Sequence, residues 1–277
     1  MTSQTYIIDQ PTLTNKNQTL LPFATTDVLI EVAGQNAHHF LHFWQLQQTM
    51  ILGMKDTRVA DLTAGLRALK KASYSPIVRN SGGLGVISDE GVLNVSLILP
   101  IEEQGQKRTI DEGYEAMLSL VRKAFSSTEI EAYEIPDSYC PGTYDLSIDG
   151  KKFAGIAQRR VKNGLAIMMY LSITGDQAAR GRAVQQFYQA SLGQKFGLDG
   201  YPPVKPDSME NLPTLLKEEM TIEQVKHQIA TAYEALYGSA KFYESTDYIE
   251  EKLLQPAIDQ HLLKMKQRNE MLKELSV

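Results

Sequence analysis

Short apolar runs separated by polar turns dominate the first two thirds of the chain, and they predict β-strands. Residues 91–100 (GVLNVSLILP) form a β-branched segment that ends at Pro100, and residues 49–54 (TMILGM) form a shorter run typical of a buried strand. Residues 76–88 (PIVRNSGGLGVIS) alternate apolar and polar positions up to a glycine-rich bend. Residues 38–48 (HHFLHFWQLQQ) have apolar spacings that fit either a helix or a loop packed on the core.

Two turn dipeptides follow the segment EIEAYEI (129–135). Asp149-Gly150 separates YDLSI from KKFAGIAQRR, and Asn163-Gly164 separates that segment from LAIMMYLSI. Both dipeptides readily supply the positive φ angles of a type I′ turn. Together they predict three antiparallel strands in a meander.

Helical periodicity appears in three other places. Residues 59–73 place three leucines on one side and basic residues on the other, and residues 111–125 begin with acids and end with bases, which suits the helix dipole. A third helix is predicted from Thr221, where Thr-x-x-Gln forms a capping box, and residues 245–277 continue helically with a bend at Pro256.

The remaining segments are less regular. Residues 1–27 are interpreted as an irregular arm or as edge elements, and residues 201–220 are loop-rich, with four prolines. The layout therefore predicts a mixed sheet flanked by helices, followed by a helical C-terminal segment.

Composition and charge narrow the possible partners. The net charge of −5 and the pI near 5.6 argue against nucleic acid, because phosphate contacts need a basic surface. The longest apolar run, residues 92–101, is strand-sized and too short to span a membrane, and the first residues lack the pattern of a secretory signal. The chain has one cysteine and hence no internal disulfide. We expect a cytoplasmic protein with no membrane or nucleic-acid partner.

The three neighbouring histidines at positions 38, 39 and 42 resemble metal ligands at first sight. They lack cysteine or carboxylate partners at a suitable spacing, so no metal site is predicted.

The glycine-rich bend RNSGGLGV contains Gly82, Gly83 and Gly85 but fits neither the P-loop nor the dinucleotide-binding spacing. One interpretation is a bend or bulge inside a sheet. The other is a ligand site, because glycine lets a ligand or another backbone lie against the strand. Arg79 and Ser81 would then donate hydrogen bonds to a carbonyl or an anion.

The only cysteine, Cys140, lies in PDSYCPG, between turn-forming residues and directly before the first hairpin. A lone cysteine is usually a buried, inert thiol. A thiol in a loop at the mouth of a sheet, however, is accessible to substrate. A free thiol has a pKa near about 8.5 and is mostly protonated at neutral pH, so a nearby ammonium would favour the reactive thiolate.

Lys152 is the candidate for that ammonium. Across a two-residue turn it is expected to pair with Ser147 and to share its face of the sheet with Asp145 and Ala154, whereas Lys151 points the other way. The alternative is a surface lysine beside a structural cysteine. Small residues that would let a long acyl chain or a docked loop approach follow Lys152: Ala154, Gly155 and Ala157.

Two of these segments together resemble the lipoate-protein ligase and octanoyltransferase superfamily. RNSGGLGVISDEGVLNVSL is similar to its R-x-S-G-G segment, and YDLSIDGKKFAGIAQRR is similar to its second signature, in which a lysine precedes a hydrophobic–small–glycine triplet. The resemblance covers roughly residues 40–230. It implies an α+β catalytic core like that of biotin-protein ligases, spanning residues 1–220, with residues 221–277 as a helical extension packed on that core.

Within the superfamily, SYCPGTYDLS followed by GKKFAGIAQRR is most similar to the lipoyl amidotransferase branch. That resemblance implies an acyl-thioester cysteine at Cys140 and a lysine that favours its thiolate at Lys152. It implies substrate-binding roles for Arg79, Ser81, Gly82 and Gly83. It also implies that the acyl donor is the glycine cleavage system H protein and that the acceptors are lipoyl domains of 2-oxoacid dehydrogenase complexes, with no cofactor.

The octanoyl chain requires an apolar slot. The expected lining consists of small and apolar side chains: Ala154, Gly155, Ala157, Val86, Ile77 and Met169. Arg159, Arg160 and Lys162 beside the hairpin either steer acidic partner domains or form a solvated strand end.

Three alternatives remain open. The first is an octanoyltransferase that takes its acyl group from acyl carrier protein, and the second is an ATP-dependent lipoate-protein ligase. The third is a non-enzymatic protein that binds lipoyl domains. Leu84 and Ser88 occupy positions where the ligases commonly have a third glycine and a histidine, and Cys140 is not needed by a ligase, so both features disfavour the ligase.

Overall fold

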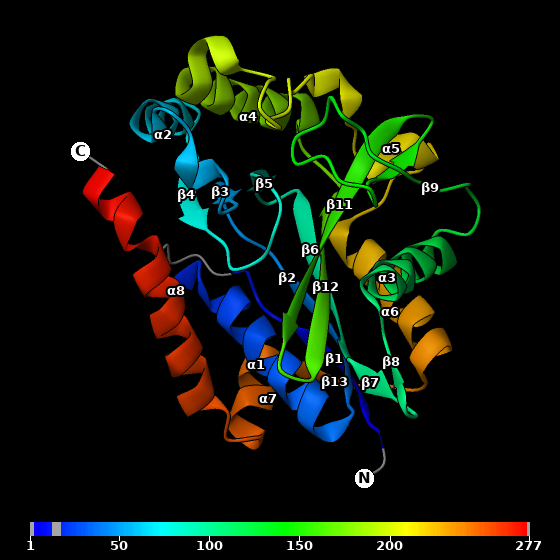
Figure 1. Cartoon of the computed structure of the whole chain (residues 1–277). Coiled ribbons are helices and arrows are strands. Elements are labelled where there is room, and N and C mark those ends of the chain that lie inside the picture. Colours follow the sequence, from blue (N-terminus) through cyan, green and yellow to red (C-terminus); the bar gives the residue numbers. More distant parts are fainter. Residues whose placement is uncertain (1–2, 13–17, 276–277) are drawn as a thin grey trace.

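A central mixed sheet runs through the molecule (Figure 1), and the structure, a computed structural model, describes residues 3–12 and 18–275. In spatial order its strands are β13 (Lys241–Glu244), β1 (Thr5–Asp9), β2 (His39–Trp44), β6 (Val92–Pro100), β12 (Gly164–Ser172), β11 (Lys151–Val161), β10 (Leu146–Ile148) and β9 (Glu131–Ala132). β1 is parallel to both of its neighbours, and the pairs from β2 to β9 are antiparallel. The predicted mixed sheet is thus confirmed.

Two smaller sheets accompany it. The first joins β4 (Ser75–Val78), β3 (Thr49–Leu52) and β5 (Val86–Ser88), and it carries the glycine-rich bend between β4 and β5. The second is a hairpin of β7 (Glu102–Glu103) and β8 (Gln106–Lys107). The 3₁₀ turns are η2 (Asp56–Arg58), η3 (Gly193–Lys195) and η4 (Pro206–Ser208).

Helices cover both faces of the central sheet. They are α1 (Leu21–Asn36), α2 (Leu62–Lys71), α3 (Ile110–Ala124), α4 (Gln177–Leu192), α5 (Leu212–Leu216), α6 (Ile222–Tyr237), α7 (Ser245–Glu251) and α8 (Gln255–Leu275). Helices α3 and α6 lie on one face, α1 and α8 lie on the other, and α2 and α4 pack at one end beside the small sheet (Figure 1). Among the described residues, no helix is both long enough and apolar enough to cross a membrane.

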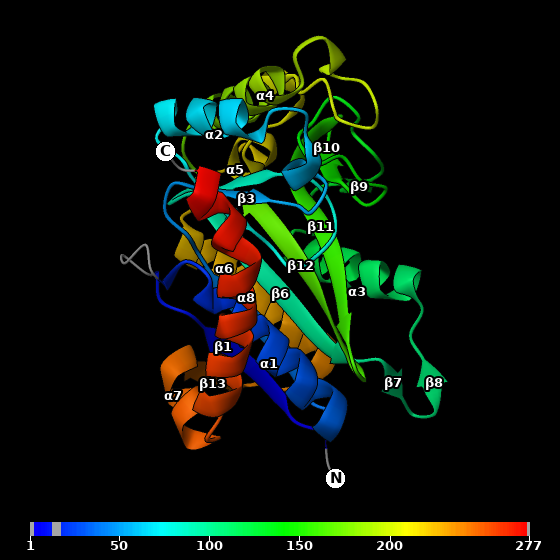
Figure 2. The same cartoon turned by 60° about the vertical axis from the view of Figure 1, so that its left-hand side comes forward.

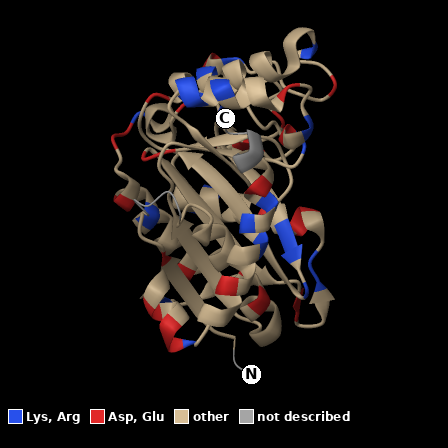
Figure 3. Ribbon diagram, turned by 90° about the vertical axis from the view of Figure 1, so that its left-hand side faces the viewer, with Lys and Arg blue, Asp and Glu red and all other residues tan. Residues whose placement is uncertain are grey.

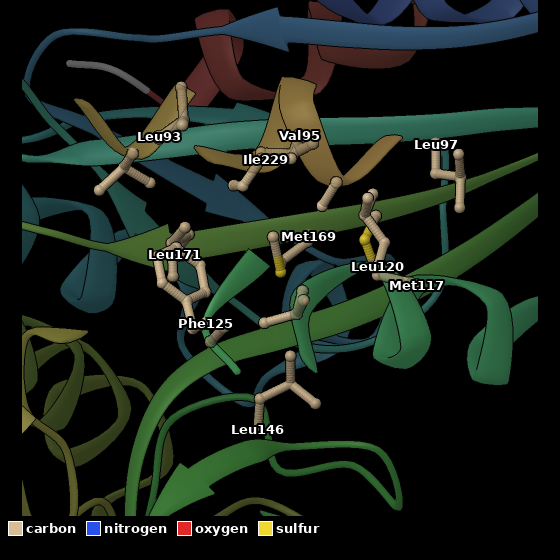
Figure 4. Close-up of a cluster of buried hydrophobic side chains, with 14 of the residues drawn as sticks. Leu93, Val95, Leu97, Met117, Leu120, Phe125, Leu146, Met169, Leu171 and Ile229 are labelled. Atoms are coloured by element: carbon tan, nitrogen blue, oxygen red, sulfur yellow. The ribbon is translucent and has the colours of Figure 1, made fainter. Parts of the chain in front are cut away.

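The largest core cluster fills the space between the sheet and the pair α3 and α6. Figure 4 shows side chains of β6 and β12 pointing toward those of α3 and α6, among them Val95, Met169, Leu120 and Ile229. The nine residues of β6 are all buried, because the sheet is covered on both faces at this strand.

The two predicted hairpins form the meander β10–β11–β12. In the first turn, Asp149 (φ 50°) and Gly150 (φ 73°) both adopt positive φ, as a type I′ turn requires. The second turn lies one residue earlier than predicted. Val161 pairs with Gly164, so Lys162 and Asn163 form the turn. Gly164 instead begins β12 at a point where a side chain would collide with the backbone of α1.

A β-bulge in β11 changes which residues share a face. Ser147 pairs with Lys152 as predicted, but Leu146 pairs with Ala154, so Phe153 is an extra residue. Phe153 and Ala154 both lie in the core cluster beside α3 and α6. The expectation that Ala154 shares the face of Lys152 was therefore wrong; Gly155, the next residue along the strand, lies on that face instead.

Several other elements differ from the prediction. Residues 39–44 form the fully buried strand β2 and not a helix or a loop. The region interpreted as an irregular arm, residues 1–27, contains β1 and the first seven residues of α1, and its residues 1–2 and 13–17 lie outside the described part of the chain. Pro256 lies at the beginning of α8 and does not bend a continuous helix.

The C-terminal segment joins the rest of the fold at two places. The predicted capping box at Thr221 is present at the start of α6, and β13 then adds an edge strand to the central sheet beside β1. Helix α8 continues along α1 up to the small sheet, where it contacts β4 (Figure 2). Residues after position 220 are thus part of the sheet as well as of its helical cover.

Candidate active site

A mostly apolar pocket with about 530 Å³ of empty space, open solvent included, lies between the central sheet, α1 and the small sheet. Its walls come from residues far apart in the sequence: Phe23, Trp44, Ile51, Arg79, Ser81, Val86, Asn94, Cys140, Lys152, Gly155, Ile156, Ala157, Met168, Met169 and Tyr170. The structure therefore brings together both of the segments that the sequence singled out. The only cysteine of the chain lies in the wall of this cavity.

Cys140 is held in an unusual backbone conformation. Its φ of 49° lies in the left-handed region, which costs a non-glycine residue about 1–3 kcal/mol. Its thiol is half-buried, and its Sγ accepts a hydrogen bond from the backbone N–H of Leu84 at 3.2 Å. The guanidinium Nη2 of Arg79 lies 3.7 Å from the same sulfur. The thiol is therefore neither fully buried in the core nor freely exposed.

Lys152 is completely buried, which the alternative of a surface lysine did not anticipate. Its Nζ forms an ion pair with Asp145 at 2.9 Å. It also donates to Ser138 Oγ (3.1 Å) and to the carbonyl oxygens of Tyr139 (3.0 Å) and Cys140 (2.9 Å). Lys152 thus fixes the backbone of the loop that carries the cysteine.

The buried carboxyl of Asp145 is adapted to this lysine. Burial raises the pKa of Asp145, and the charge and hydrogen bond of Lys152 oppose that effect. The backbone N–H of Ile135 donates to the other carboxylate oxygen at 3.1 Å. Asp145 therefore connects Lys152 to the start of the cysteine loop.

The glycine-rich bend lies directly against the sulfur. A side chain on Gly83 would meet Cys140 Sγ at 3.0 Å and would collide with Arg79. Arg79 and Ser81 face the cavity, whereas a side chain on Gly82 would meet open space. The bend is thus both a turn between β4 and β5 and a wall of the site, which combines the two interpretations drawn from the sequence.

A buried hydrogen-bond network that sequence reasoning missed supports this bend. Asp56 accepts from Gly53 N at 2.7 Å and from the hydroxyl of Tyr188 at 2.7 Å, and that hydroxyl accepts from Gly85 N at 3.3 Å. Burial raises the pKa of Asp56 to about 6. Because Gly85 follows Leu84, the network fixes the peptide that donates to the sulfur.

Sequence reasoning also missed a second buried hydrogen-bond network, which contacts the cysteine loop at Tyr139. Arg180 forms a two-pronged ion pair with Asp89 at 2.8 and 2.7 Å and donates to Ser172 Oγ at 3.0 Å. Ser172 bonds Gln177, whose amide donates to the hydroxyl of Tyr139 at 3.1 Å. Tyr139 precedes Cys140, so this polar network anchors the loop from the inside.

Only some of the residues expected to line the acyl slot lie at the cavity. Gly155, Ala157, Val86 and Met169 line the cavity. Ala154 faces the opposite side of the sheet, and Ile77 belongs to the core cluster beneath the small sheet and does not line the cavity. Sequence reasoning missed seven further wall residues: Phe23, Trp44, Ile51, Asn94, Ile156, Met168 and Tyr170. Strand alternation puts Met168 and Tyr170 together on the face of β12 opposite Met169, so the choice of Met169 led away from both. Nothing in the sequence placed α1 over the cavity.

The basic cluster and the histidines have local partners. Arg159 pairs with buried Asp27 at 2.5 Å, and Lys162 pairs with Glu31 at 2.9 Å. His42 lies on β2 between Thr26 and Gln10 in the interior, and burial lowers its pKa to about 3.

Comparisons with known proteins define the class. Residues 18–234 match the family of the lipoyl protein ligase A/B catalytic domain. In the described structure this match contains the cavity, the glycine-rich bend and the cysteine loop. The chain belongs to this family, as its two signature segments predicted.

Individual relatives narrow the comparison. The chain is 40% identical over 269 residues to "Octanoyl-[GcvH]:protein N-octanoyltransferase" of Bacillus velezensis, an alignment that covers 95% of this chain and 91% of the relative. It is 42% identical to "Lipoyl-[GcvH]:protein N-lipoyltransferase" of Listeria monocytogenes, with 78% of each chain covered. Among solved structures, lipoate-protein ligase A bound with ATP has a TM-score of 0.66 at 16% identity, with 94% of this chain and 95% of the other covered. That likeness shows the fold alone.

Proposed function

We propose that this protein transfers an octanoyl or lipoyl group from the lysine of glycine cleavage H protein to the lysine of lipoyl domains in 2-oxoacid dehydrogenase complexes. The names of the relatives support H protein as the donor, since both the octanoyl- and the lipoyltransferase names contain it. One structural observation carries the chemistry. The only thiol of the chain lies in the wall of an apolar cavity, with a backbone N–H and a guanidinium directed at its sulfur.

The donor bond is an amide, which resists attack, and the exchange of one amide for another needs no energy source. Covalent catalysis divides the exchange into two steps. In the first step the Cys140 thiolate attacks the carbonyl carbon of the octanoyl amide, a C–S bond forms, and the carbonyl electron pair moves to oxygen. The C–N bond then breaks, and the departing lysine amine takes a proton from the Lys152 ammonium.

The second step reverses the first with a new amine. The lysine of the lipoyl domain attacks the thioester, its proton passes to neutral Lys152, and the thiolate leaves. Lys152 suits this role because its side chain lines the cavity and reaches the cysteine loop. Asp145 at 2.9 Å favours the restored ammonium.

The apolar cavity suits the fatty chain. Burial of each methylene contributes about 0.8 kcal/mol, so eight carbons provide several kcal/mol of binding. Phe23 and Trp44 pack edge to face with ring centroids 5.1 Å apart and provide a rigid wall, whereas Met168 provides an adaptable one. An adaptable wall is consistent with a slot that also accepts the bulkier lipoyl ring.

Charge steering of the partner domains is local. Basic and acidic residues are mixed over the side shown in Figure 3, and two members of the predicted basic cluster are already paired with carboxylates. Arg160 donates to backbone carbonyls of Arg108 and Thr109, so it keeps its charge without a carboxylate. Arg108 pairs with Glu103 at 3.3 Å, so we assign the attraction of acidic domains to Arg160.

Intact mass spectrometry tests this function directly. Purified protein is mixed in parallel with octanoyl-H protein, with octanoyl-acyl carrier protein, and with free octanoate plus ATP, each with and without a lipoyl domain. We expect an octanoyl adduct on Cys140 from octanoyl-H protein that is labile to hydroxylamine, and its passage to the lipoyl domain. Cys140→Ser should abolish both.

The other arms separate the alternatives. Efficient use of only the carrier protein would identify the first alternative, and modification that requires ATP would identify the ligase. Binding of the lipoyl domain with no adduct from any donor would identify a non-enzymatic protein.

A further inference from the structure

Arg79 is a buried cation that the buried carboxyl of Asp56 attracts only from a distance, without a direct ion pair. Its side chain is more than nine-tenths buried, yet no carboxylate of the described chain forms an ion pair with it. Its Nε has no hydrogen-bond partner, and its Nη2 donates to the carbonyl oxygen of Leu84 at 2.9 Å. A buried charge without a close counter-charge is unfavourable, so a second anion in direct contact with Arg79 would be stabilised.

The nearest group that can supply the missing charge is the sulfur. Nη2 of Arg79 lies 3.7 Å from Cys140 Sγ, and the N–H of Leu84 is directed at the same atom from 3.2 Å. As a thiolate, the sulfur would be the anion that the guanidinium lacks, and Leu84 would supply a directional hydrogen bond. The glycine-rich bend therefore directs two hydrogen-bond donors at the sulfur, the cationic guanidinium of Arg79 and the neutral backbone N–H of Leu84.

Lys152 is arranged differently. Its charge is already countered by Asp145, and its ammonium contacts four oxygens, one of which is the carbonyl oxygen of Cys140. No contact joins its Nζ to the sulfur among the described atoms. The lysine is thus placed to orient the loop and to exchange protons, and not to serve as the counter-ion of the nucleophile.

We propose that Arg79 is the counter-ion that holds Cys140 as a thiolate, with the Leu84 N–H as its partner donor. This role rests on the proposed acyl transfer and adds a catalytic residue to it. When the thiolate attacks, the negative charge moves from sulfur to the carbonyl oxygen within the same site. Arg79 therefore has a close anionic partner in the thiolate and in both tetrahedral intermediates, and it lacks that partner in the thioester.

The test uses the only thiol of the chain as a reporter and needs no protein substrate. The rate of alkylation by iodoacetamide, a neutral reagent, is measured against pH for wild type, Arg79→Met and Arg79→Lys. An opposite charge at this separation favours the anion by about tenfold or more, so Arg79→Met should be alkylated about tenfold more slowly at neutral pH. The two rates should converge at alkaline pH, where both thiols are ionised. Arg79→Lys should recover most of the neutral-pH rate.

Matched controls keep the result interpretable. Arg182→Met removes an arginine from an exposed pair with Asp176 on α4 and should leave the profile unchanged. Circular dichroism monitors folding of each variant. If Arg79→Met and Arg79→Lys lower the rate equally at every pH, Arg79 has only a structural role, and an unchanged profile in Arg79→Met also overturns the proposal.

The two hypotheses fail separately. Absence of an acyl adduct on wild-type Cys140 would refute the proposed transfer even if the alkylation results held. Normal adduct formation in wild type, together with an unaltered alkylation profile in Arg79→Met, would refute only the role of Arg79.

Discussion

Replacement of Lys152 by methionine should destabilise the protein strongly, although the two side chains are similar in volume. Lys152 is completely buried, and its partner Asp145 is 2% exposed. Removal of one member of such a buried pair typically costs about 3–5 kcal/mol, because the other charge remains in the interior. A natural domain has a total stability of about 5–15 kcal/mol, so the variant should fold but should melt roughly 10 °C lower.

The loss should depend on pH. Burial raises the pKa of Asp145, and without Lys152 the chief opposing interaction disappears. A carboxyl with a raised pKa in the folded state stabilises the protein below its unfolded pKa, near 3.8, and this contribution is lost as the pH rises. The difference between wild type and Lys152→Met should therefore be largest at neutral pH and smaller near about pH 5.

Urea unfolding followed by circular dichroism measures both effects. Asp145→Asn combined with Lys152→Met removes both charges and should restore part of the loss at neutral pH. Lys205→Met removes an exposed lysine from its pair with Asp137 and should change stability only slightly. A similarly small effect in Lys152→Met, independent of pH, would refute the view that this pair is a buried structural element.

Three further variants test the surroundings of the site. Gly155→Ala places a methyl group 3.2–3.3 Å from Cε and Nζ of Lys152, and the displacement should reduce the rate of acyl transfer roughly tenfold in a steady-state assay with little change in melting temperature. Burial raises the pKa of Asp56 to about 6, so its contribution to stability is present below about pH 4 and lost as the pH rises through about 6. Urea titrations measure the free energy of unfolding at acidic and at neutral pH. Between these pH values, the free energy of unfolding of Asp56→Asn should rise by about 3 kcal/mol relative to that of wild type. Asn269→Leu removes the side-chain amide that accepts from Val78 N at 2.7 Å and donates to Val78 O at 3.0 Å. The free energy of unfolding should fall by about 2 kcal/mol in the same titration, and acyl transfer should be slower.

The two signature segments could be located from the sequence because turn chemistry is local. Asp149-Gly150 fixes a type I′ turn whatever surrounds it, so the pairing of Ser147 with Lys152 followed directly. The bulge at Phe153 has no such local signal. It reflects packing of two consecutive side chains into the core beside α3, and it moved Ala154 away from the cavity.

Sequence reasoning missed α1, β2 and two buried networks for a different reason, which is that each is buried inside the fold. Helix α1 buries residues on most of its circumference, from Pro22 to Ala33, so it lacks the polar stripe that reveals a surface helix. Strand β2 is buried on both faces, so its sequence lacks the alternation of apolar and polar residues that marks a half-exposed strand. The networks around Asp56 and Arg180 join residues more than ninety positions apart, and only the assembled fold brings these residues together.

The parallel pairing of β1 with β13 has a consequence for synthesis on the ribosome. Tyr6 emerges long before its partner Lys241, and α8 with its Asn269 follows later still. One edge of β1 therefore stays open through most of translation, and such an edge can pair with other chains. The nascent chain should therefore need protection against such pairing until β13 has been released.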